Sequence, residues 1–250
     1  MSRNRLGGLR VGQVPRVVGS ITQAETLGRM GRLTDFIFDV AEIRWDKIGT
    51  EKTSVLLSCR QIERDGAPVI LTIRSAQEGG AWQGDETRRL ALYKEALPYV
   101  SAVDVEIASS IFQSVIKAAH KAGKAVIGSF HDFEQTSDAE TLLGIVRRGR
   151  RAGADIVKIA AMIHGPSDIA VLTSVLNIEG KKPLCLIGMG QYGVTTRVTL
   201  ACKGSCLTYG YADRSAASGQ TPSSTLMRRL RKHCPAYEKD YLSRHGLVSA

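Results

Sequence analysis

Short runs of apolar, β-branched residues recur along this chain, and a polar stretch long enough for a helix follows each of them. The candidate strands are RVVGSI (16–21), FIFDVAEIR (36–44), PVILTIR (68–74), AVDVEIA (102–108), AVIGSFH (125–131), DIVKIA (155–160), PLCLIGM (183–189) and SCLTYGY (205–211). Residues 110–123 and 141–153 carry apolar positions at helical spacing and end at a glycine. Regular alternation of strand and helix predicts an α/β fold, with helices covering a parallel sheet.

The number of these units narrows the prediction further. Eight strand–helix repeats in 250 residues favour a closed (β/α)8 TIM barrel over an open sheet, since such barrels are typically about this long. No linker rich in proline or serine interrupts the alternation, so we expect one barrel domain over residues 1–250. The opening segment LGGLRVGQVP (6–15) is expected to form a short hairpin or loop across the bottom of the barrel.

Membrane, secreted and metal-binding classes find little support in the sequence. No run approaches the ~18 consecutive apolar residues of a membrane span, and the basic start MSRNRLGGLR lacks the apolar stretch of a secretory signal. We therefore expect a cytoplasmic protein without a membrane partner. A lone C-x3-C without histidine partners is a weak metal motif, so we expect no metal and interpret the cysteines as reduced thiols, mostly in the core. They are Cys59, Cys185, Cys202, Cys206 and Cys234.

The basic character of the chain bears on its partners. The formal charge is +10, and much of the excess lies in RRGRR (147–151) and RRLRKH (228–233). Neither cluster is interleaved with aromatic residues or belongs to a known nucleic-acid motif. We therefore interpret both as exposed helix faces or ends, and expect a small anionic substrate rather than a nucleic acid.

Ionisable side chains fall late in the predicted strands, where a barrel builds its active site. Side chains two apart share one face of a strand, so each strand presents a defined set toward the mouth. The set comprises Glu42 and Arg44, Thr72 and Arg74, Asp104 and Glu106, His131, and Lys158. Burying so many charges together without a ligand would be costly, so five adjacent strands that end this way predict a site.

Lys158 is the most unusual of these residues. It interrupts the apolar stretch GADIVKIA (153–160), where an ammonium group is costly to bury unless it is used or neutralised. An amine in a dry pocket near other cations gives up its proton more readily, and can then attack a carbonyl to form a Schiff base. A histidine one strand away is suited to remove the acidified proton next to the imine. The arginines would hold a carboxylate, and Glu42 with Arg74 could bind hydroxyl groups.

A second motif points to different chemistry. GMGQYG (188–193) matches G-x-G-x-x-G, follows a predicted strand and precedes a predicted helix, and Asp213 lies where a dinucleotide fold would place its ribose-binding acid. That fingerprint normally opens a sheet, whereas only one strand candidate follows it here. We therefore expect these glycines to shape a loop at the barrel mouth that presents Arg197, and we expect no cofactor.

Six motifs taken together closely resemble the type I 3-dehydroquinate dehydratases of the shikimate pathway. They keep order and spacing from about Ser20 to Gln220, and the fold of that family is a (β/α)8 barrel. The motifs are EIRWD (42–46), TIRSAQEGG (72–80), SFHDF (129–133), DIVKIA (155–160), GMGQYGVTTR (188–197) and SGQ (218–220).

The resemblance implies roles for individual residues. Lys158 corresponds to the lysine that forms a Schiff base with the ring ketone of 3-dehydroquinate. His131 corresponds to the general acid/base, and Glu78 to the glutamate that pairs with this histidine. The remaining matches imply substrate contacts, with Arg197 and Gln220 at the carboxylate, Glu42, Arg44 and Arg74 at the hydroxyls, and Ser20 at the edge of the site. The resemblance also implies a homodimer.

The sequence departs from the family pattern at the last loop. The family usually has A-S-A-P-G-Q where this chain has SAASGQ (215–220), so Ala216 replaces a serine that contacts the substrate and Ser218 replaces the proline. Ser215 or Ser218 are candidates to substitute for the missing hydroxyl. Thr196 stands where the family tends to have a serine. No catalytic group is lost, so we expect activity, with substrate affinity the property most open to change.

Three alternatives remain open at the level of sequence. A class I aldolase would use the same lysine but does not require TIRSAQEGG or SGQ. A nicotinamide-dependent oxidoreductase would use GMGQYG, and a non-catalytic basic protein would need neither motif. A biosynthetic and a catabolic dehydratase would look alike in sequence.

Overall fold

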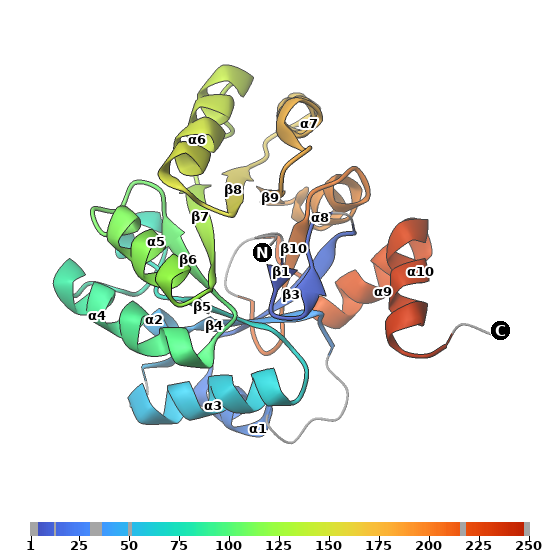
Figure 1. Cartoon of the computed structure of the whole chain (residues 1–250). Helices are drawn as coiled ribbons and strands as arrows, with labels where there is room; N and C mark the ends of the chain where they lie inside the picture. Colours follow the sequence, from blue (N-terminus) through green and yellow to red (C-terminus); the bar gives the residue numbers. More distant parts are fainter. Residues whose placement is uncertain (1–4, 13, 31–36, 50–51, 216–218, 248–250) are drawn as a thin grey trace.

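The computed structural model describes residues 5–12, 14–30, 37–49, 52–215 and 219–247. Its strands form an eight-stranded parallel sheet that curls into a nearly closed barrel, and Figure 1 shows helices arranged around it. The barrel strands are β3 Arg16–Ile21, β4 Val40–Arg44, β5 Val69–Thr72, β6 Ala102–Glu106, β7 Ala125–Asp132, β8 Ile156–Met162, β9 Leu184–Met189 and β10 Leu207–Tyr211. All eight predicted strands are therefore present, and the fold class is confirmed.

The sheet order is β10-β3-β4-β5-β6-β7-β8-β9, so neighbours in sequence are neighbours in space apart from the closing pair. Strand β10 pairs with β3, and the Cys206 amide just before β10 donates to the Leu184 carbonyl of β9 at 2.9 Å, which brings the two ends of the sheet together.

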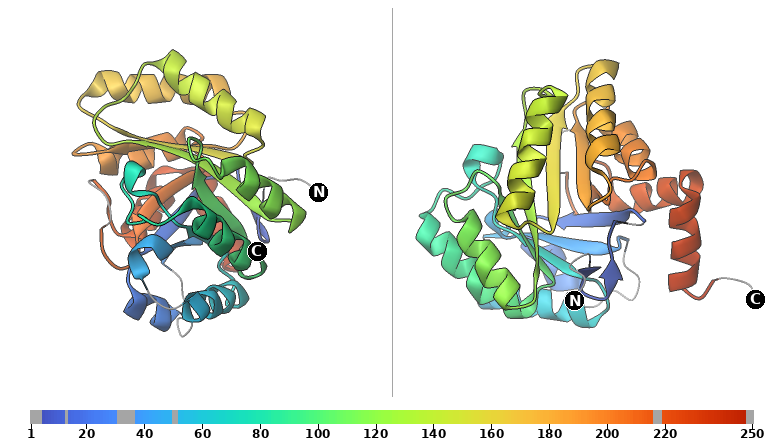
Figure 2. Two further views of the ribbon diagram at one scale, coloured as in Figure 1. Left: turned by 90° about the vertical axis from the view of Figure 1, so that its left-hand side faces the viewer. Right: turned by 45° about the horizontal axis from the view of Figure 1, so that its top comes forward.

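Helices connect consecutive strands and pack on the outside of the barrel, as both views in Figure 2 show. They are α1 Ala24–Met30, α2 Trp45–Ile48, α3 Lys52–Arg64, α4 Glu86–Ala96, α5 Phe112–Lys121, α6 Ala139–Ala152, α7 Pro166–Glu179, α8 Gly193–Cys202, α9 Ser223–His233 and α10 Pro235–Arg244, with 3-10 turns η1 Ala76–Glu78 and η2 Leu97–Tyr99. Helix α6 illustrates the local rules, because Asp138 caps its first turn and Gly153, at φ 108°, ends it.

The amino-terminal hairpin closes the bottom of the barrel. Strands β1 (Arg5–Leu6) and β2 (Leu9–Arg10) pair antiparallel. Leu6 and Val11 are buried in a cluster of apolar side chains from the barrel strands, and a Cβ at Gly7 would lie close to Ser101 and Pro68, which directly precede β6 and β5. The predicted hairpin is therefore present, and its apolar side chains plug the end of the barrel opposite the carboxyl ends of the strands.

The carboxyl-terminal helices extend beyond the eight repeats. Helix α9 contacts β3 and β10, and α10 packs on α9. Tyr237 of α10 is fully buried and its hydroxyl donates to Asp39 at 2.8 Å. The sequence did not predict α10, since its polar composition hides one buried aromatic anchor.

Two other sequence expectations concern the surface. Within RRGRR, Arg148 and Arg151 are exposed while Gly149 is buried, so this cluster is an exposed helix face as expected. Four cysteines are buried and Cys202 is exposed, all as free thiols. Among the described residues, no helix is long and apolar enough to cross a membrane.

Candidate active site

A cavity opens at the carboxyl ends of the barrel strands, and the candidate site residues line it together. Because parallel strands present their last side chains at one mouth, residues from β3, β4, β7, β8 and β10 meet there with residues from the following loops. The lining includes all nine predicted residues: Ser20, Glu42, Arg44, Arg74, Glu78, His131, Lys158, Arg197 and Gln220.

Lys158 lies at the centre of this site. Only 4% of the residue is exposed, and its ammonium donates to Asp104 Oδ2 at 2.9 Å. Glu42 Oε1 lies 3.8 Å away, and the ring centroid of Tyr209 lies 4.0 Å from Nζ. Our expectation that cations would surround this lysine is therefore wrong for its nearest neighbours. Two carboxylates and an aromatic face stabilise a positive charge at this position instead.

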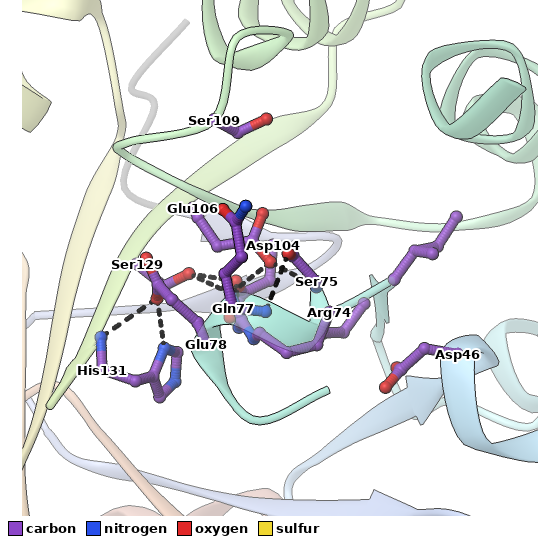
Figure 3. Close-up of polar contacts among 12 residues, drawn as sticks. Asp46, Arg74, Ser75, Gln77, Glu78, Asp104, Glu106, Ser109, Ser129 and His131 are labelled. Atoms are coloured by element: carbon purple, nitrogen blue, oxygen red, sulfur yellow. Dashed lines mark hydrogen bonds and ion pairs between the residues drawn. The ribbon is translucent and has the colours of Figure 1, made fainter. Parts of the chain in front are cut away.

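Asp104 is fully buried and contacts three of the surrounding polar residues. Its Oδ1 accepts from Arg74 Nη2 at 2.7 Å and from Ser129 Oγ at 2.6 Å, while Oδ2 accepts from Lys158. Burial alone would raise the pKa of Asp104, but the charges of Arg74 and Lys158 hold it well below its usual range. Asp104 is therefore ionised and balances two cations, as the dashed contacts around it in Figure 3 indicate for Arg74 and Ser129.

Glu42 is held by hydroxyl groups from the two neighbouring strands. Ser20 Oγ donates to Glu42 Oε2 at 2.6 Å, and Thr72 Oγ1 donates to Glu42 Oε1 at 2.9 Å. The first contact follows from strand register, since Ser20 pairs with Glu42 across β3 and β4, whereas Thr72 pairs with Arg44 and reaches Glu42 diagonally. The carboxylate is thereby fixed 3.8 Å from the Lys158 ammonium.

His131 and Glu78 form a pair at one wall of the cavity. Glu78 Oε2 accepts the backbone N–H of His131 at 3.0 Å and lies 2.8 Å from ring Nδ1, and Figure 3 shows both contacts. With Nδ1–H donating to the carboxylate, Nε2 is the basic nitrogen of the ring. Glu78 reaches this position because Ser75 caps the 3-10 turn and Gly79, at φ 73°, ends it.

The protonation of this pair is not what a carboxylate beside a histidine would give by itself. A carboxylate beside His131 should raise the pKa of the ring, yet burial, followed by the charges of Arg74 and Lys158, lowers it well below its usual value. Burial, with Glu106 and Asp104 nearby, raises the pKa of Glu78 to about 7 despite Arg74. When the pair takes up a proton near pH 7, that proton therefore resides mainly on the carboxyl group of Glu78.

Arg197 is a buried cation whose guanidinium donates to backbone carbonyl groups. It is 3% exposed, and its guanidinium donates to the carbonyls of Tyr209 at 2.9 Å and Gly188 at 2.8 Å. Burial lowers its pKa to about 10. Within the described part of the chain, no carboxylate lies close enough to form an ion pair with it. A buried cation held only by carbonyl groups favours a negatively charged ligand.

The glycine motif forms the turn from β9 into α8, the helix that carries Arg197. Gly190 has φ 81°, and a Cβ at Gly193 would lie 2.8 Å from the Gly219 carbonyl oxygen and 2.9 Å from Arg197 Nη1. The glycines thus permit close backbone packing beside the guanidinium. Thr196, buried on the same turn, donates to the carbonyl of Tyr192 at 3.0 Å.

Asp213, the acidic residue that a dinucleotide fold would use to bind the ribose, has a structural role here. Asp213 accepts from the amides of Thr22 at 2.8 Å and Gln23 at 2.9 Å, which ties the loop after β3 to the loop after β10. The motif also lies between β9 and α8 of a barrel, not at the start of an open sheet. The sequence predicted a loop that presents Arg197, whereas the structure places only residues 190–192 between β9 and α8 and Arg197 on the second turn of α8 itself.

Arg44 is positioned by a residue that the sequence did not single out. Its Nε and Nη2 form a bidentate pair with Asp46 at 3.0 and 2.8 Å, and Asp46 also accepts the Ala81 amide at 3.0 Å. Asp46 therefore connects Arg44 to the loop that carries Glu78. Its place in EIRWD, two residues after Arg44, was the available clue.

Three further residues belong to the site without having been assigned a role. Asp104 had been placed on the correct strand face, but not beside Lys158. Tyr209 had no assignment, although its ring covers the ammonium. Ser129, inside the SFHDF motif, accepts from Arg74 at 2.7 Å. In the last loop, Ser215 is described, whereas Ala216 and Ser218 lie outside the described residues.

Fold and site together define a class of protein: a (β/α)8 barrel with a buried lysine, a histidine–glutamate pair and a buried arginine around one cavity at the carboxyl ends of its strands. A sequence profile of the type I 3-dehydroquinases matches residues 17–233. The chain belongs to this family, and is thus a lyase that acts on carbon–oxygen bonds.

Relatives of known name agree over most of the chain. A 3-dehydroquinate dehydratase from Methanocella arvoryzae is 33% identical over 218 residues, covering 87% of this chain and 96% of the relative. The 3-dehydroquinate dehydratase of Methanococcoides burtonii is 32% identical over 231 residues, covering 90% and 97%.

Solved structures lead to the same family. The type I 3-dehydroquinate dehydratase of Clostridium difficile, determined with covalently modified comenic acid, superposes with a TM-score of 0.83 at 26% identity, covering 93% of this chain and 97% of that one. The 3-dehydroquinate dehydratase of Geobacillus kaustophilus gives a TM-score of 0.82 at 25% identity, covering 93% and 99%.

Proposed function

We propose that this enzyme dehydrates 3-dehydroquinate to 3-dehydroshikimate, a step of the shikimate pathway, through a Schiff base on Lys158. The observation that carries the proposal is the placement of the Lys158 amine and the His131 ring on the wall of one cavity that also contains Arg197. An amine nucleophile, a base and an anion-binding group are what an imine-based dehydration of a carboxylate substrate requires.

The first step forms the imine. The Lys158 ammonium gives up one proton, and the neutral amine adds to the ring ketone of the substrate. The ketone oxygen then leaves as water after taking up the second nitrogen proton and the returned one, which leaves a positively charged iminium. Because Asp104, Glu42 and Tyr209 already surround a positive charge at Nζ, the iminium inherits the same stabilisation. The surroundings of the lysine are thus complementary to the intermediate.

The second step is the elimination. The iminium withdraws electrons and acidifies the adjacent C–H, and Nε2 of His131 accepts that proton. The electron pair left on carbon forms the new double bond as the hydroxyl group leaves, and His131 returns its proton so that water departs. Hydrolysis of the iminium then consumes one water, releases the enone product and regenerates Lys158.

The remaining polar residues hold the substrate. Arg197 binds the carboxylate, with Gln220 beside it on the cavity wall. Arg44, Arg74 and Glu42 are assigned to the ring hydroxyls, and Ser20 to the edge of the site where it fixes Glu42. The structure supports these contacts through proximity and charge.

The reaction can be tested directly. Incubation of the protein with 3-dehydroquinate should produce the ultraviolet absorbance of a conjugated enoate, without added metal or nicotinamide. Carbon–carbon cleavage products without this absorbance would favour an aldolase instead. A requirement for a nicotinamide cofactor would favour an oxidoreductase.

A further inference from the structure

A buried ion pair holds the start of the segment that carries Glu78. Arg89, on α4, is 1% exposed, and Glu106, the last residue of β6, is 2% exposed. Arg89 Nη1 lies 2.9 Å from Glu106 Oε2 and donates to Glu106 Oε1 at 3.2 Å. Neither residue belongs to the lining of the catalytic cavity, so an influence of this pair on the reaction has to pass through other residues.

The pair contacts three consecutive residues where β5 gives way to the η1 turn. Arg89 Nη1 donates to the carbonyl of Ile73 at 3.1 Å. Glu106 Oε1 accepts the Ser75 amide at 2.8 Å and lies 3.3 Å from Arg74 Nη1, and Figure 3 shows Glu106 beside both residues. Residues 73–75 are therefore held by a guanidinium at one end and by a carboxylate at the other.

Ser75 in turn sets the position of Glu78. The hydroxyl of Ser75 accepts the Gln77 amide at 3.2 Å, and its carbonyl accepts the amides of Glu78 at 3.1 Å and Gly80 at 2.9 Å. Glu78 leaves this turn with its Oε2 2.8 Å from Nδ1 of His131. A shift of Ser75 would therefore move the carboxylate that orients the histidine ring.

The planar guanidinium of Arg89 spans several elements at once. Besides its contacts with Ile73 and Glu106, its Nη2 donates to Glu86 Oε2 and to Ser109 Oγ, both at 2.8 Å. It thereby joins α4 to β6 and to the segments that follow β5 and β6. An ammonium group carries the same charge but lacks the fixed fork, so a lysine could not make these contacts together.

We propose that Arg89 is a positioning residue, which fixes residues 73–75 and thereby holds Glu78 against His131. The contact between the carboxylate and the ring exists without substrate, so this role can be measured directly. Its consequence for turnover rests on the proposed function, in which His131 moves the proton. A displacement of about 1 Å at a catalytic group can cost about 100-fold in rate.

The tautomer of His131 is the first measurement. Arg89→Lys keeps the charge opposite Glu106 and should fold, which circular dichroism verifies. Arg88→Lys, the same substitution at the exposed neighbour on α4, is the matched control. ¹⁵N NMR, at a pH above the pKa of about 7 of Glu78, should show the ring proton on Nδ1 in the native protein and in the control.

In Arg89→Lys the ring should also populate the Nε2–H tautomer, because Glu78 no longer holds Nδ1–H. Glu86→Gln is a milder second variant, since it weakens one contact of the guanidinium at a partly exposed position, and it should give the same change to a lesser extent. A ring that stays wholly in the Nδ1–H form in Arg89→Lys, or in Glu86→Gln if the lysine variant does not fold, would overturn the proposal.

The second measurement asks whether Arg89 acts through Glu78. Arg89→Lys should lower kcat about 10- to 100-fold, whereas Arg88→Lys should not change it. In a Glu78→Ala background, Arg89→Lys should change kcat by less than about 2-fold, since the group that it positions is gone. An equal loss in both backgrounds would show a general structural effect and overturn the proposal. Native enzyme that does not dehydrate 3-dehydroquinate would refute the proposed function instead, and the tautomer would still decide the role of Arg89.

Discussion

The ammonium of Lys158 donates to Asp104 Oδ2 at 2.9 Å, while the other oxygen of the same carboxylate accepts from Arg74 and Ser129. One buried carboxylate therefore contacts two buried cations, and Glu42 near Lys158 and Glu106 near Arg74 complete the charge balance. This relationship makes an ammonium tolerable inside a barrel strand, and it keeps the amine directed at the cavity where a carbonyl would bind.

Asp104→Asn should be strongly destabilising. The variant leaves Arg74 and Lys158 buried with less compensation, and breaking a buried ion pair typically costs about 3–5 kcal/mol. Urea denaturation measures the free energy of unfolding. Glu95→Gln is the control, because it removes an exposed ion pair with Lys52 and should change stability by about 0–1 kcal/mol. Equal effects of the two variants would contradict the organising role of Asp104.

Arg197→Lys should weaken substrate binding. A lysine keeps the charge but loses the planar, bidentate geometry that suits a carboxylate. Loss of one such charged contact is worth about 10- to 100-fold in the Michaelis constant, with a smaller effect on kcat. Steady-state kinetics with 3-dehydroquinate separates the two. Arg231→Lys, at an exposed pair with Glu238, should be silent. An unchanged Michaelis constant in Arg197→Lys would show that the carboxylate binds elsewhere.

Glu78→Gln should move the acidic limb of the pH profile of kcat/KM downward. In the native pair, Glu78 takes up a proton with a pKa of about 7 and then no longer accepts from Nδ1–H of His131. Activity should therefore fall as the pH drops through about 7. The glutamine cannot take up that proton, so only His131 remains to titrate, and its pKa lies well below 6.5. An acidic limb that stays in place or rises would refute this assignment.

His131→Ala should separate imine formation from proton transfer. Loss of the base should reduce the rate by about 10²–10⁴-fold or more. The amine of Lys158 remains, so the variant should still accumulate an imine with substrate, detectable by mass spectrometry after borohydride reduction. If no adduct forms, His131 is needed for imine formation as well, and the two roles are not separate.

The sequence predicted the barrel because each of its units is locally encoded. Apolar runs and helical spacing mark β3 to β10, and the late position of His131 in β7 is enough to place it at the mouth. Lys158 was expected near the end of its strand, but β8 continues to Met162 and Lys158 is the third of its seven residues. Strand ends were less accurate. The run PVILTIR was expected to continue to Arg74, yet β5 ends at Thr72, where the chain turns into the loop that carries Glu78.

Contacts between residues on non-adjacent strands of the barrel could not be predicted from the sequence. Asp104 reaches Lys158 across β7, the strand between β6 and β8, and that contact depends on the curvature and register of the closed sheet. The lowered pKa of His131 was missed for the same reason, because it depends on burial and on the positions of Arg74 and Lys158. Glu78, by contrast, was found only through its place in a known motif.

The identity of the nucleophile is the central claim, and borohydride trapping tests it most directly. Reduction in the presence of 3-dehydroquinate should attach the product covalently to the protein, and peptide mass spectrometry should locate it at Lys158. Lys158→Ala should show no adduct. A label on another lysine, such as Lys124 or Lys181, or turnover that persists in Lys158→Ala, would contradict the account.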